Sequence, residues 1–234
     1  MSNHMTYLKI SSKLPNPDSE CDPAWMQWDK FIVCHQLPIT DEEVVRRYQN
    51  VEQESRSYLE AAELNHFLNL RHFGLKSIYA EVAQEHYLLD EDDYAVNASI
   101  DALDAVFSEK ACRFSEDSLV FKGVSSKPFY KIHSFETIDV GQEVHFPGYV
   151  SVSVCRRKAL DFAFTEGVLL VIRGLDLVNC IVPPNSKVST TAGADVPEHE
   201  IVLHRGVTMA VERIVQKQDK NHREVHLKVV EQPS

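Results

Sequence analysis

Two glutamates stand two positions apart in the segment Val196–Gly206, whose sequence is VPEHEIVLHRG. Side chains at positions i and i+2 of a β-strand point to the same side, so Glu198 and Glu200 can face one site. One carboxylate could stabilise a developing positive charge there while the other orients or deprotonates a nucleophile. The alternative is a pair of exposed glutamates on a charged sheet edge, where such residues are common.

The same segment contains His199, Glu200 and His204, which invites comparison with a zinc site. The two-histidine helical motif has the spacing HExxH, however, and here the spacing is one residue longer in a segment with strand composition. The five cysteines contain no CxxC pair. The acidic run Asp90–Asp93 lacks the ligand alternation and central glycine of a calcium loop, and we expect a solvated loop or a helix cap. The sequence therefore predicts no metal site.

A pair of serines follows the turn signal Pro147-Gly148. Ser151 and Ser153 lie on one face of an expected strand, and Phe162 lies on the helix that follows. Alternatively, the serines satisfy backbone groups or face water, and Phe162 packs in the core. No GxSxG elbow surrounds either serine, so we do not expect a hydrolase nucleophile.

A lysine, Lys122, lies between Phe121 and Gly123 in a short apolar segment. A glycine beside it lets the backbone approach a ligand closely, while the ammonium could hold a phosphate. The alternative is an edge lysine whose charged head stays in water.

The elements that must position these residues differ between the two halves of the chain. Residues 1–117 contain 10 basic and 22 acidic side chains and one of the eight glycines, whereas residues 118–234 contain 14 basic, 13 acidic and the other seven glycines. We therefore expect a mainly helical acidic region over 1–117, followed by an α+β domain over 118–234 built on antiparallel or mixed sheets. Helices are expected from about 40 and over 54–72, 77–89, 95–113 and 156–164, and strands over 119–124, 149–153, 168–172, 179–182, 200–204, 207–214 and 222–230.

The overall composition narrows the classes of partner. Asp and Glu number 35 and Lys and Arg 24, for a formal charge of −11, which argues against nucleic acid or an anionic membrane as the main partner. The longest apolar runs, such as Val168–Ile172, are too short to span a bilayer. The N-terminus lacks the apolar core of a signal peptide, and the odd number of widely spaced cysteines indicates a reducing compartment.

In order and spacing, the lysine, serine and glutamate segments together resemble the arginine–serine–glutamate class of mono-ADP-ribosyltransferases. This class includes toxins, phage enzymes, bacterial effectors and vertebrate ecto-enzymes. The resemblance rests on Phe121–Gly123, on Phe146–Ser153 with Phe162, and on Glu198–Gly206. It covers about residues 118–230. It implies two roughly perpendicular β-sheets with NAD in the cleft between them, preceded here by the helical region.

The resemblance assigns NAD-binding roles. Lys122 stands where the family has an arginine that holds the NAD phosphates and ribose. Lysine supplies one mobile charge in place of a planar fork, so this contact is either weaker or moved to another residue. The backbone of Gly123 would bind the nicotinamide carboxamide. The candidates for a displaced phosphate contact are Arg113, Arg156 and Arg157.

The serine and aromatic positions carry over in the same way. Ser151 would shape the NAD pocket and steady the catalytic glutamate. With Ser153 it forms the family's serine motif, although Val152 replaces the middle hydroxyl residue. Phe162 would pack on the cationic nicotinamide ring.

The glutamates would carry the reaction. The resemblance makes Glu200 the catalytic residue, which binds the ribose hydroxyl and stabilises the oxocarbenium-like transition state as nicotinamide leaves. Glu198 would engage the acceptor, and two glutamates favour an arginine acceptor. The loop 189–197 would be the substrate-recognition turn.

The leading hypothesis is therefore an NAD-dependent mono-ADP-ribosyltransferase that acts on a protein, either in its own cytosol or as a secreted effector or toxin in a host cytosol. A second hypothesis is an NAD glycohydrolase, with water as the acceptor. A third is a degenerate domain that binds a partner protein, since Lys122 and Val152 depart from the family pattern. The acidic region 1–117 could bind a basic partner.

Overall fold

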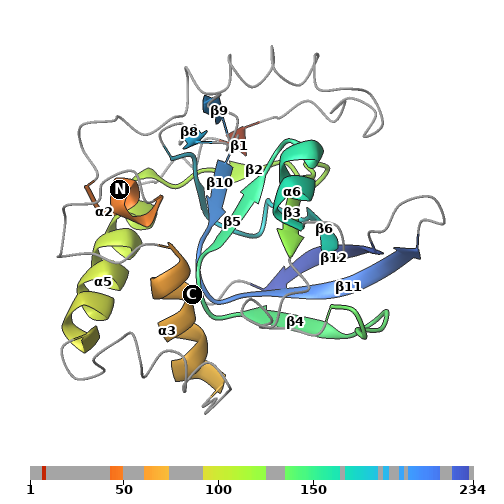
Figure 1. Ribbon diagram of the computed structural model, residues 1–234, viewed down its shortest axis with the longest axis horizontal. Helices are drawn as coiled ribbons and strands as arrows, with labels where there is room; N and C mark the ends of the chain where they lie inside the picture. The colour runs from red at the N-terminus through yellow and green to blue at the C-terminus, as the bar shows by residue number, and fades with distance from the viewer. Residues whose placement is uncertain are drawn as a thin grey trace.

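The computed structural model has an α+β fold in which helices gather beside a large mixed sheet (Figure 1). The expected helix over 77–89, Glu198 and His199 lie outside the residues that the structure describes. The described residues are 7–8, 43–49, 61–73, 92–124, 135–163, 167–183, 187–189, 195–197, 200–216 and 223–231.

Three described helices precede the sheet: α2 (Glu43–Tyr48), α3 (Ala61–Phe73) and α5 (Asp92–Lys110). Helix α5 begins inside the acidic run, where carboxylates interact favourably with the positive end of the helix dipole. It ends three residues earlier than expected because Cys112 exchanges both backbone hydrogen bonds with Cys180, at 2.8 and 2.9 Å.

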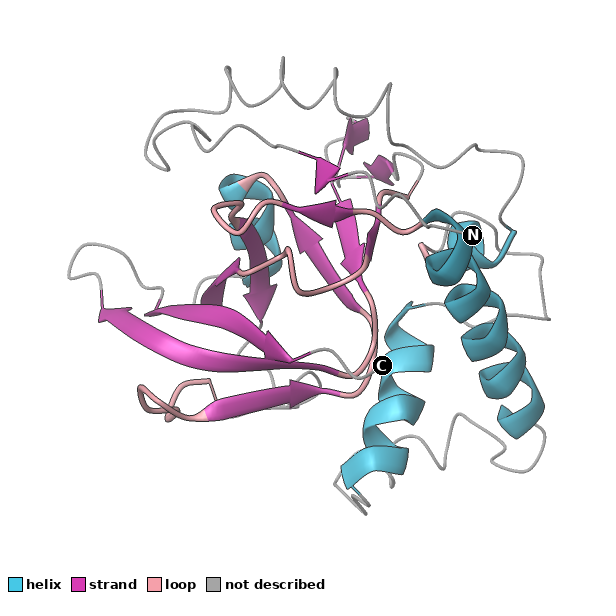
Figure 2. Cartoon of the chain, turned by 180° about the vertical axis from the view of Figure 1, so that it is seen from behind, coloured by secondary structure: helices cyan, strands magenta, loops and turns pink. Residues whose placement is uncertain are grey.

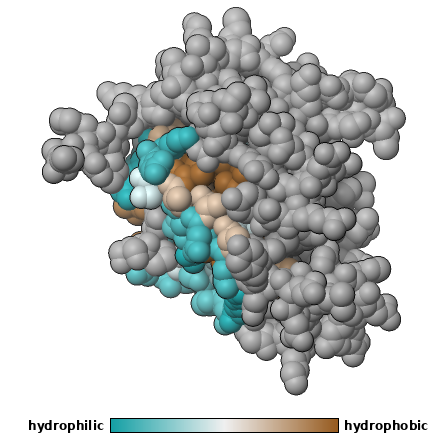
Figure 3. All heavy atoms as spheres, turned by 90° about the vertical axis from the view of Figure 1, so that its left-hand side faces the viewer, coloured by the Kyte–Doolittle hydropathy of each residue, from teal (hydrophilic) through white to brown (hydrophobic). Residues whose placement is uncertain are grey.

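Helices α2, α3 and α5 lie together on one side of the molecule in both ribbon views (Figures 1 and 2). Helix α5 buries Val96, Leu103 and Phe107 and exposes Asp101 and Glu109, as an amphipathic helix does. From this side, a hydrophobic patch of described side chains is bordered by hydrophilic ones (Figure 3). Among the described helices, none is long and apolar enough to cross a membrane.

Eight strands form one hydrogen-bonded sheet in the order β4-β11-β12-β6-β3-β5-β10-β7. Their bounds are β3 Val120–Val124, β4 Glu143–Phe146, β5 Val150–Ser153, β6 Val168–Arg173, β7 Cys180–Ile181, β10 Glu200–Leu203, β11 Val207–Gln216 and β12 Arg223–Glu231. Two short pairs accompany it: β1 (Tyr7–Leu8) runs parallel to β2 (Arg113–Phe114), and β8 (Lys187–Ser189) runs antiparallel to β9 (Asp195–Pro197).

The expected α+β class is confirmed, and every strand expected over 118–234 is present with ends that differ by one or two residues. Three strands were not expected within that region. Strand β4 has only Val144 and Phe146 as apolar residues, which is too weak a pattern to stand out. Strands β8 and β9 occupy both ends of the loop expected over 189–197, so that expectation was wrong for Ser189 and for Asp195–Pro197.

The sheet narrows between β3 and β5. One residue pair, Phe121 with Ser153, joins these strands, whereas five pairs join β3 to β6 and four join β5 to β10. This junction separates a five-stranded group from the three-stranded group β5-β10-β7. In Figure 1, β4 and β11 run across the view while β5 and β10 run upward, so strands near the two ends of the sheet cross, as expected for two sheets that cross.

Alternation along β10 divides its side chains between two apolar clusters. Ile201 and Leu203 pack in the main core, with residues such as Leu170 of β6. Val202 points the other way and packs with the helices, in a cluster that includes Phe107 of α5. Glu200, two positions before Val202, therefore lies on the helix-facing side of the strand.

Helix α6 (Arg156–Ala163) lies against β3 and packs Ala159 on Phe121. A Cβ atom on Gly123 would lie 1.8 Å from the carbonyl oxygen of Ala159, and one on Gly167 would lie 2.0 Å from that of Ala163. Close approach of α6 therefore requires glycine at 123, whatever its backbone does for a ligand.

Candidate active site

The three segments expected to carry chemistry lie on neighbouring strands, because β5 is placed between β3 and β10. Ser153 of β5 pairs with Phe121 of β3 on one side and with Glu200 of β10 on the other. Ser151 stands opposite Val202. Residues that are about 80 positions apart in the chain therefore meet where the sheet narrows.

Lys122 reaches across this junction. Its Nζ donates a hydrogen bond to the backbone oxygen of Ser151 at 3.0 Å. Burial lowers the pKa of Lys122, and the negative charge of Glu200 raises it in part. An ammonium has three donors, so this bond leaves capacity for an anionic ligand. The alternative of an edge lysine with its head in open water does not fit, because the side chain is half-buried.

The two serines have different surroundings. Ser153 is buried, and its Oγ accepts a hydrogen bond from the backbone N–H of Cys155 at 3.0 Å, just before α6 begins. This matches the alternative in which a serine satisfies the backbone. Ser151 is half-buried, and its Oγ lies 3.3 Å from the hydroxyl of Tyr48. Ser151 is thus the serine whose hydroxyl faces the helices.

Two residues from the end of α2 complete the arrangement, and sequence reasoning missed both. Gln49 donates a hydrogen bond from Nε2 to Oε2 of Glu200 at 2.7 Å. The Tyr48 hydroxyl lies 3.5 Å from the backbone oxygen of Tyr149 and receives a hydrogen bond from Asn65 at 3.2 Å. Burial is the main reason that the pKa of Tyr48 is raised, so this phenol stays protonated.

Two of the arginines considered for a displaced phosphate contact are engaged elsewhere. Arg113 donates to the side chain of Asn179 at 2.9 Å and to the backbone oxygen of Asp176 at 3.3 Å. Arg156 forms an ion pair with the buried Glu224 of β12. Arg157 is exposed on α6. Among the described contacts, the cation at the junction with Ser151 is Lys122.

Phe162 is 49% exposed on α6. The alternative that Phe162 belongs to the core is therefore wrong. No described contact joins it to Lys122 or Glu200, and its proposed contact with nicotinamide remains a prediction. The role of Glu198 also remains a prediction.

A second carboxylate, Asp104 of α5, binds the residues that follow β10. It receives hydrogen bonds from Arg205 Nε and Nη2, the shortest at 2.6 Å, and from the Tyr149 hydroxyl at 2.6 Å. His204 Nε2 lies 3.2 Å from the same carboxylate, and its ring meets Phe107 edge-on. His204 is thus part of a helix-to-strand contact. Among the described residues, no group of three or more metal-ligating side chains is placed to hold an ion.

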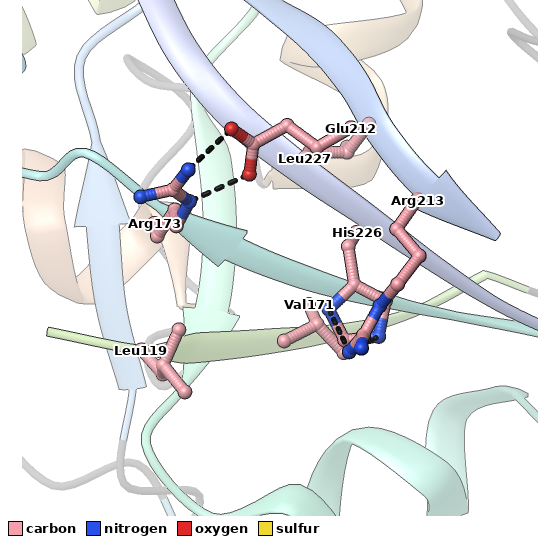
Figure 4. A pocket seen from close by; sticks show the side chains of 7 residues that line it. All are labelled: Leu119, Val171, Arg173, Glu212, Arg213, His226 and Leu227. Atoms are coloured by element: carbon pink, nitrogen blue, oxygen red, sulfur yellow. Dashed lines mark hydrogen bonds and ion pairs between the residues drawn. The ribbon is translucent and has the colours of Figure 1, made fainter. Parts of the chain in front are cut away.

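The structure also contains an open cavity of about 440 Å³ on another part of the sheet (Figure 4). Arg173 and Glu212 form a two-pronged ion pair on one side of it, and Arg213 contacts His226 on the other. None of the expected site residues lines this cavity. Its lining residues are Leu119, Val171, Arg173, Glu212, Arg213, His226 and Leu227.

Comparison with solved structures shows which proteins have a similar fold. The chain is similar to the ADP-ribosyltransferase Vis in complex with agmatine, with a TM-score of 0.55 and 12% identity over 94% of this chain and 89% of that one. It is also similar to the Clostridium limosum C3 exoenzyme, with a TM-score of 0.55 and 14% identity over 96% of this chain and 98% of that one. The chain has the fold of ADP-ribosyltransferase toxins. No family model matches the sequence, and no curated protein matches it either.

The likeness of fold extends beyond the half of the chain on which the sequence resemblance rested. Both alignments cover more than nine-tenths of this chain. A second structure of Vis, the Vis toxin from Vibrio splendidus, is similar over 94% of this chain and 89% of that one, with a TM-score of 0.51 and 12% identity.

Proposed function

We propose that this protein is an NAD-dependent mono-ADP-ribosyltransferase that modifies a protein side chain, with arginine as the favoured acceptor. The observation that carries the proposal is the meeting of Lys122, Ser151 and Glu200 where β3, β5 and β10 adjoin. The fold shared with ADP-ribosyltransferase toxins supports it. The Vis structure contains agmatine, a small guanidinium compound, which supports testing a guanidinium acceptor first.

NAD is the substrate in this proposal. The ammonium of Lys122 would contact its pyrophosphate through the donors that the Ser151 contact leaves available. The backbone at Gly123 would hold the nicotinamide carboxamide. Ser151 and Ser153 would border the nicotinamide ribose, and Phe162, with its ring half exposed, would pack on the nicotinamide.

Glu200 would act on the bond that breaks. As the bond between the ribose C1′ and the nicotinamide nitrogen lengthens, its electron pair moves onto the ring nitrogen and neutralises the pyridinium charge. Positive charge then develops on the ribose, where the Glu200 carboxylate stabilises it and binds a ribose hydroxyl. A nitrogen of the acceptor forms the new bond to C1′ and loses a proton, which Glu198 would receive.

The experiment is to mix the protein with labelled NAD and either agmatine or cell lysate, and to measure nicotinamide release and label transfer. We expect both with the wild type and neither with Glu200→Ala. Glu212→Ala is a matched control, because Glu212 is an exposed carboxylate on β11 outside the site. No nicotinamide release and no label transfer by the wild type would overturn the proposal.

Two outcomes point to the alternative functions. Free ADP-ribose without labelled acceptor would identify a glycohydrolase. An inactive wild type that gains activity with Lys122→Arg would identify a degenerate domain.

The toxin fold also supports action in a host cytosol. Expression in a recipient cell tests this, and we expect growth arrest that depends on Glu200.

A further inference from the structure

We infer that Gln49 is both a positioning residue for Glu200 and a contact for the substrate. Its amide nitrogen holds the carboxylate, and its amide oxygen accepts a hydrogen bond from an O–H or N–H group of the substrate. This inference rests on the proposed function and adds a residue from the acidic helical region to the site.

The position of Gln49 is fixed by the end of α2. Its backbone N–H donates to the backbone oxygen of Val45 at 3.0 Å, which continues the last helical turn. The neighbouring residues Val44, Val45 and Tyr48 are buried against the other helices and β10. Gln49 is therefore presented to Glu200 from an anchored backbone.

The chemistry of the pair fixes which way the amide points. A glutamine amide has two N–H donors on one side and a carbonyl acceptor on the other, whereas an ionised carboxylate only accepts. The 2.7 Å contact with Glu200 Oε2 must therefore use Nε2, and Oε1 must point elsewhere.

The Oε1 atom of Gln49 is the feature that indicates a ligand. Oε1 of Gln49 is buried and has no hydrogen-bond partner among the residues that the structure describes. A buried acceptor without a donor destabilises the protein, because it has lost its hydrogen bonds to water and gained none in return. A substrate donor placed beside Glu200 would remove this destabilisation. The donor would come either from NAD, as a ribose hydroxyl or carboxamide N–H, or from the guanidinium of the acceptor.

The test compares Gln49→Ala and Gln49→Glu with Gln216→Ala, an exposed glutamine at the end of β11. Nicotinamide release in buffer and transfer to agmatine are measured with the full chain. We expect Gln49→Ala to lower kcat for both reactions by about 10- to 100-fold, because Glu200 is no longer held in position. Equal kinetics in Gln49→Ala and Gln216→Ala would overturn the inference.

The two variants also separate positioning from substrate contact. Gln49→Glu places two carboxylates together, so we expect the acidic limb of the pH–rate profile to move to higher pH. If the missing donor belongs to NAD, Gln49→Ala raises KM for NAD in both reactions. If it belongs to the acceptor, KM rises for agmatine while KM for NAD in hydrolysis is unchanged. If neither KM nor the pH profile changes, Gln49 has only a structural role.

A measurement without turnover keeps this inference distinct from the proposed function. The Glu200 carboxyl can be titrated by carbon NMR in the wild type and in Gln49→Ala, with Glu200→Gln to assign its signal. We expect a higher pKa for Glu200 in Gln49→Ala because a donor to the charged form is lost. If the wild type is inactive but this pKa shift is observed, the proposed enzymatic function is wrong while the contact between Gln49 and Glu200 is confirmed. An unchanged titration would overturn the contact itself.

Discussion

Glu200 and Asp104 are two carboxylates at the same interface between helices and β10, and their partners differ. Asp104 receives hydrogen bonds from the guanidinium of Arg205 and the hydroxyl of Tyr149 and lies beside His204. The hydrogen bond described for Glu200 comes from the neutral amide of Gln49.

The pKa of Asp104 reflects its partners. Burial by itself would raise this pKa, but hydrogen bonds from His204, Arg205 and Tyr149 outweigh it and hold the pKa well below its usual range. A carboxylate neutralised by an adjacent guanidinium stabilises the fold. Glu200 accepts a hydrogen bond from a neutral amide and interacts electrostatically with Lys122, which is itself a candidate substrate contact. The contacts of Asp104 are structural, and the proposed function assigns the chemistry to Glu200.

The largest expected effect is on activity. Glu200→Gln should lower nicotinamide release by about 10²- to 10³-fold, because the charge that stabilises the transition state is lost while the shape is kept. Its Tm should stay close to that of the wild type. The measurement is steady-state release of nicotinamide with a thermal melt of the same sample. A large drop in Tm would show that Glu200 is structural, and the distinction from Asp104 would fail.

The opposite result is expected for Asp104. Asp104→Asn should lower the free energy of unfolding by about 2–3 kcal/mol, because the partly buried Arg205 loses its countercharge. Urea unfolding measures this loss. The activity of the folded fraction should change much less than in Glu200→Gln. A loss of activity with no loss of stability would assign Asp104 to the site.

Acid unfolding provides a control for Asp104. Its folded pKa lies below the unfolded value of about 3.9, so its contribution is fully present above about pH 4 and is lost as the pH falls further. The wild type should therefore lose stability more steeply than Asp104→Asn over this acidic range. Parallel curves for the two proteins would contradict the assignment.

A pair of tyrosines sharpens the comparison with smaller effects. Tyr149→Phe removes a donor to charged Asp104 and should cost about 1.5–3 kcal/mol of stability. Tyr48→Phe removes a hydroxyl that contacts Ser151 and should cost about 1 kcal/mol, with the clearer effect on KM for NAD. Urea unfolding and nicotinamide release are measured on both variants. Identical profiles would mean that the two hydroxyls serve the same purpose.

The sequence predicted the strands of residues 118–234 better than it predicted the contacts between these strands and the helices of residues 1–117. Short apolar runs bounded by turns, such as 120–124 and 168–173, produced strands with nearly the expected ends. Strand β4 was missed because it forms through pairing with β11, and its own sequence has little strand character. The expected end of α5 was too late because pairing of Cys112 with Cys180 stops the helix, and that partner lies 68 residues away.

The candidate site shows the same limit. Lys122, Ser151 and Glu200 could be named from local patterns and a family resemblance. Their meeting depends on β5 lying between β3 and β10, which no local pattern encodes. The contact of Gln49 with Glu200 joins residues 151 positions apart. Nothing in the sequence around Gln49 distinguishes it from a surface glutamine at a helix end.

The smallest expected effect concerns a third contact between helices and sheet. His72 of α3 lies 4.5 Å, between ring centroids, from His145 of β4, whose Nδ1 lies 3.1 Å from the Thr208 hydroxyl. Burial and the neighbouring His72 lower the pKa of His145, and the charge of Glu231 partly opposes this. The unfolded chain therefore binds a proton more readily than the folded one near pH 6.5.

Because the folded pKa is lowered, the stability associated with His145 is present above about pH 6.5 and is lost as the pH falls below it. We expect His145→Asn to reduce the loss between pH 7.5 and pH 5.5 by about 0.5–1 kcal/mol in urea unfolding, while an amide can still bond to Thr208. This window lies above the one in which Asp104 titrates, so the two contacts can be separated in one protein. If His145→Asn and the wild type lose the same stability over this range, the α3–β4 contact is insensitive to pH. Of the contacts compared, Asp104 would then be the one through which acid lowers the free energy of unfolding.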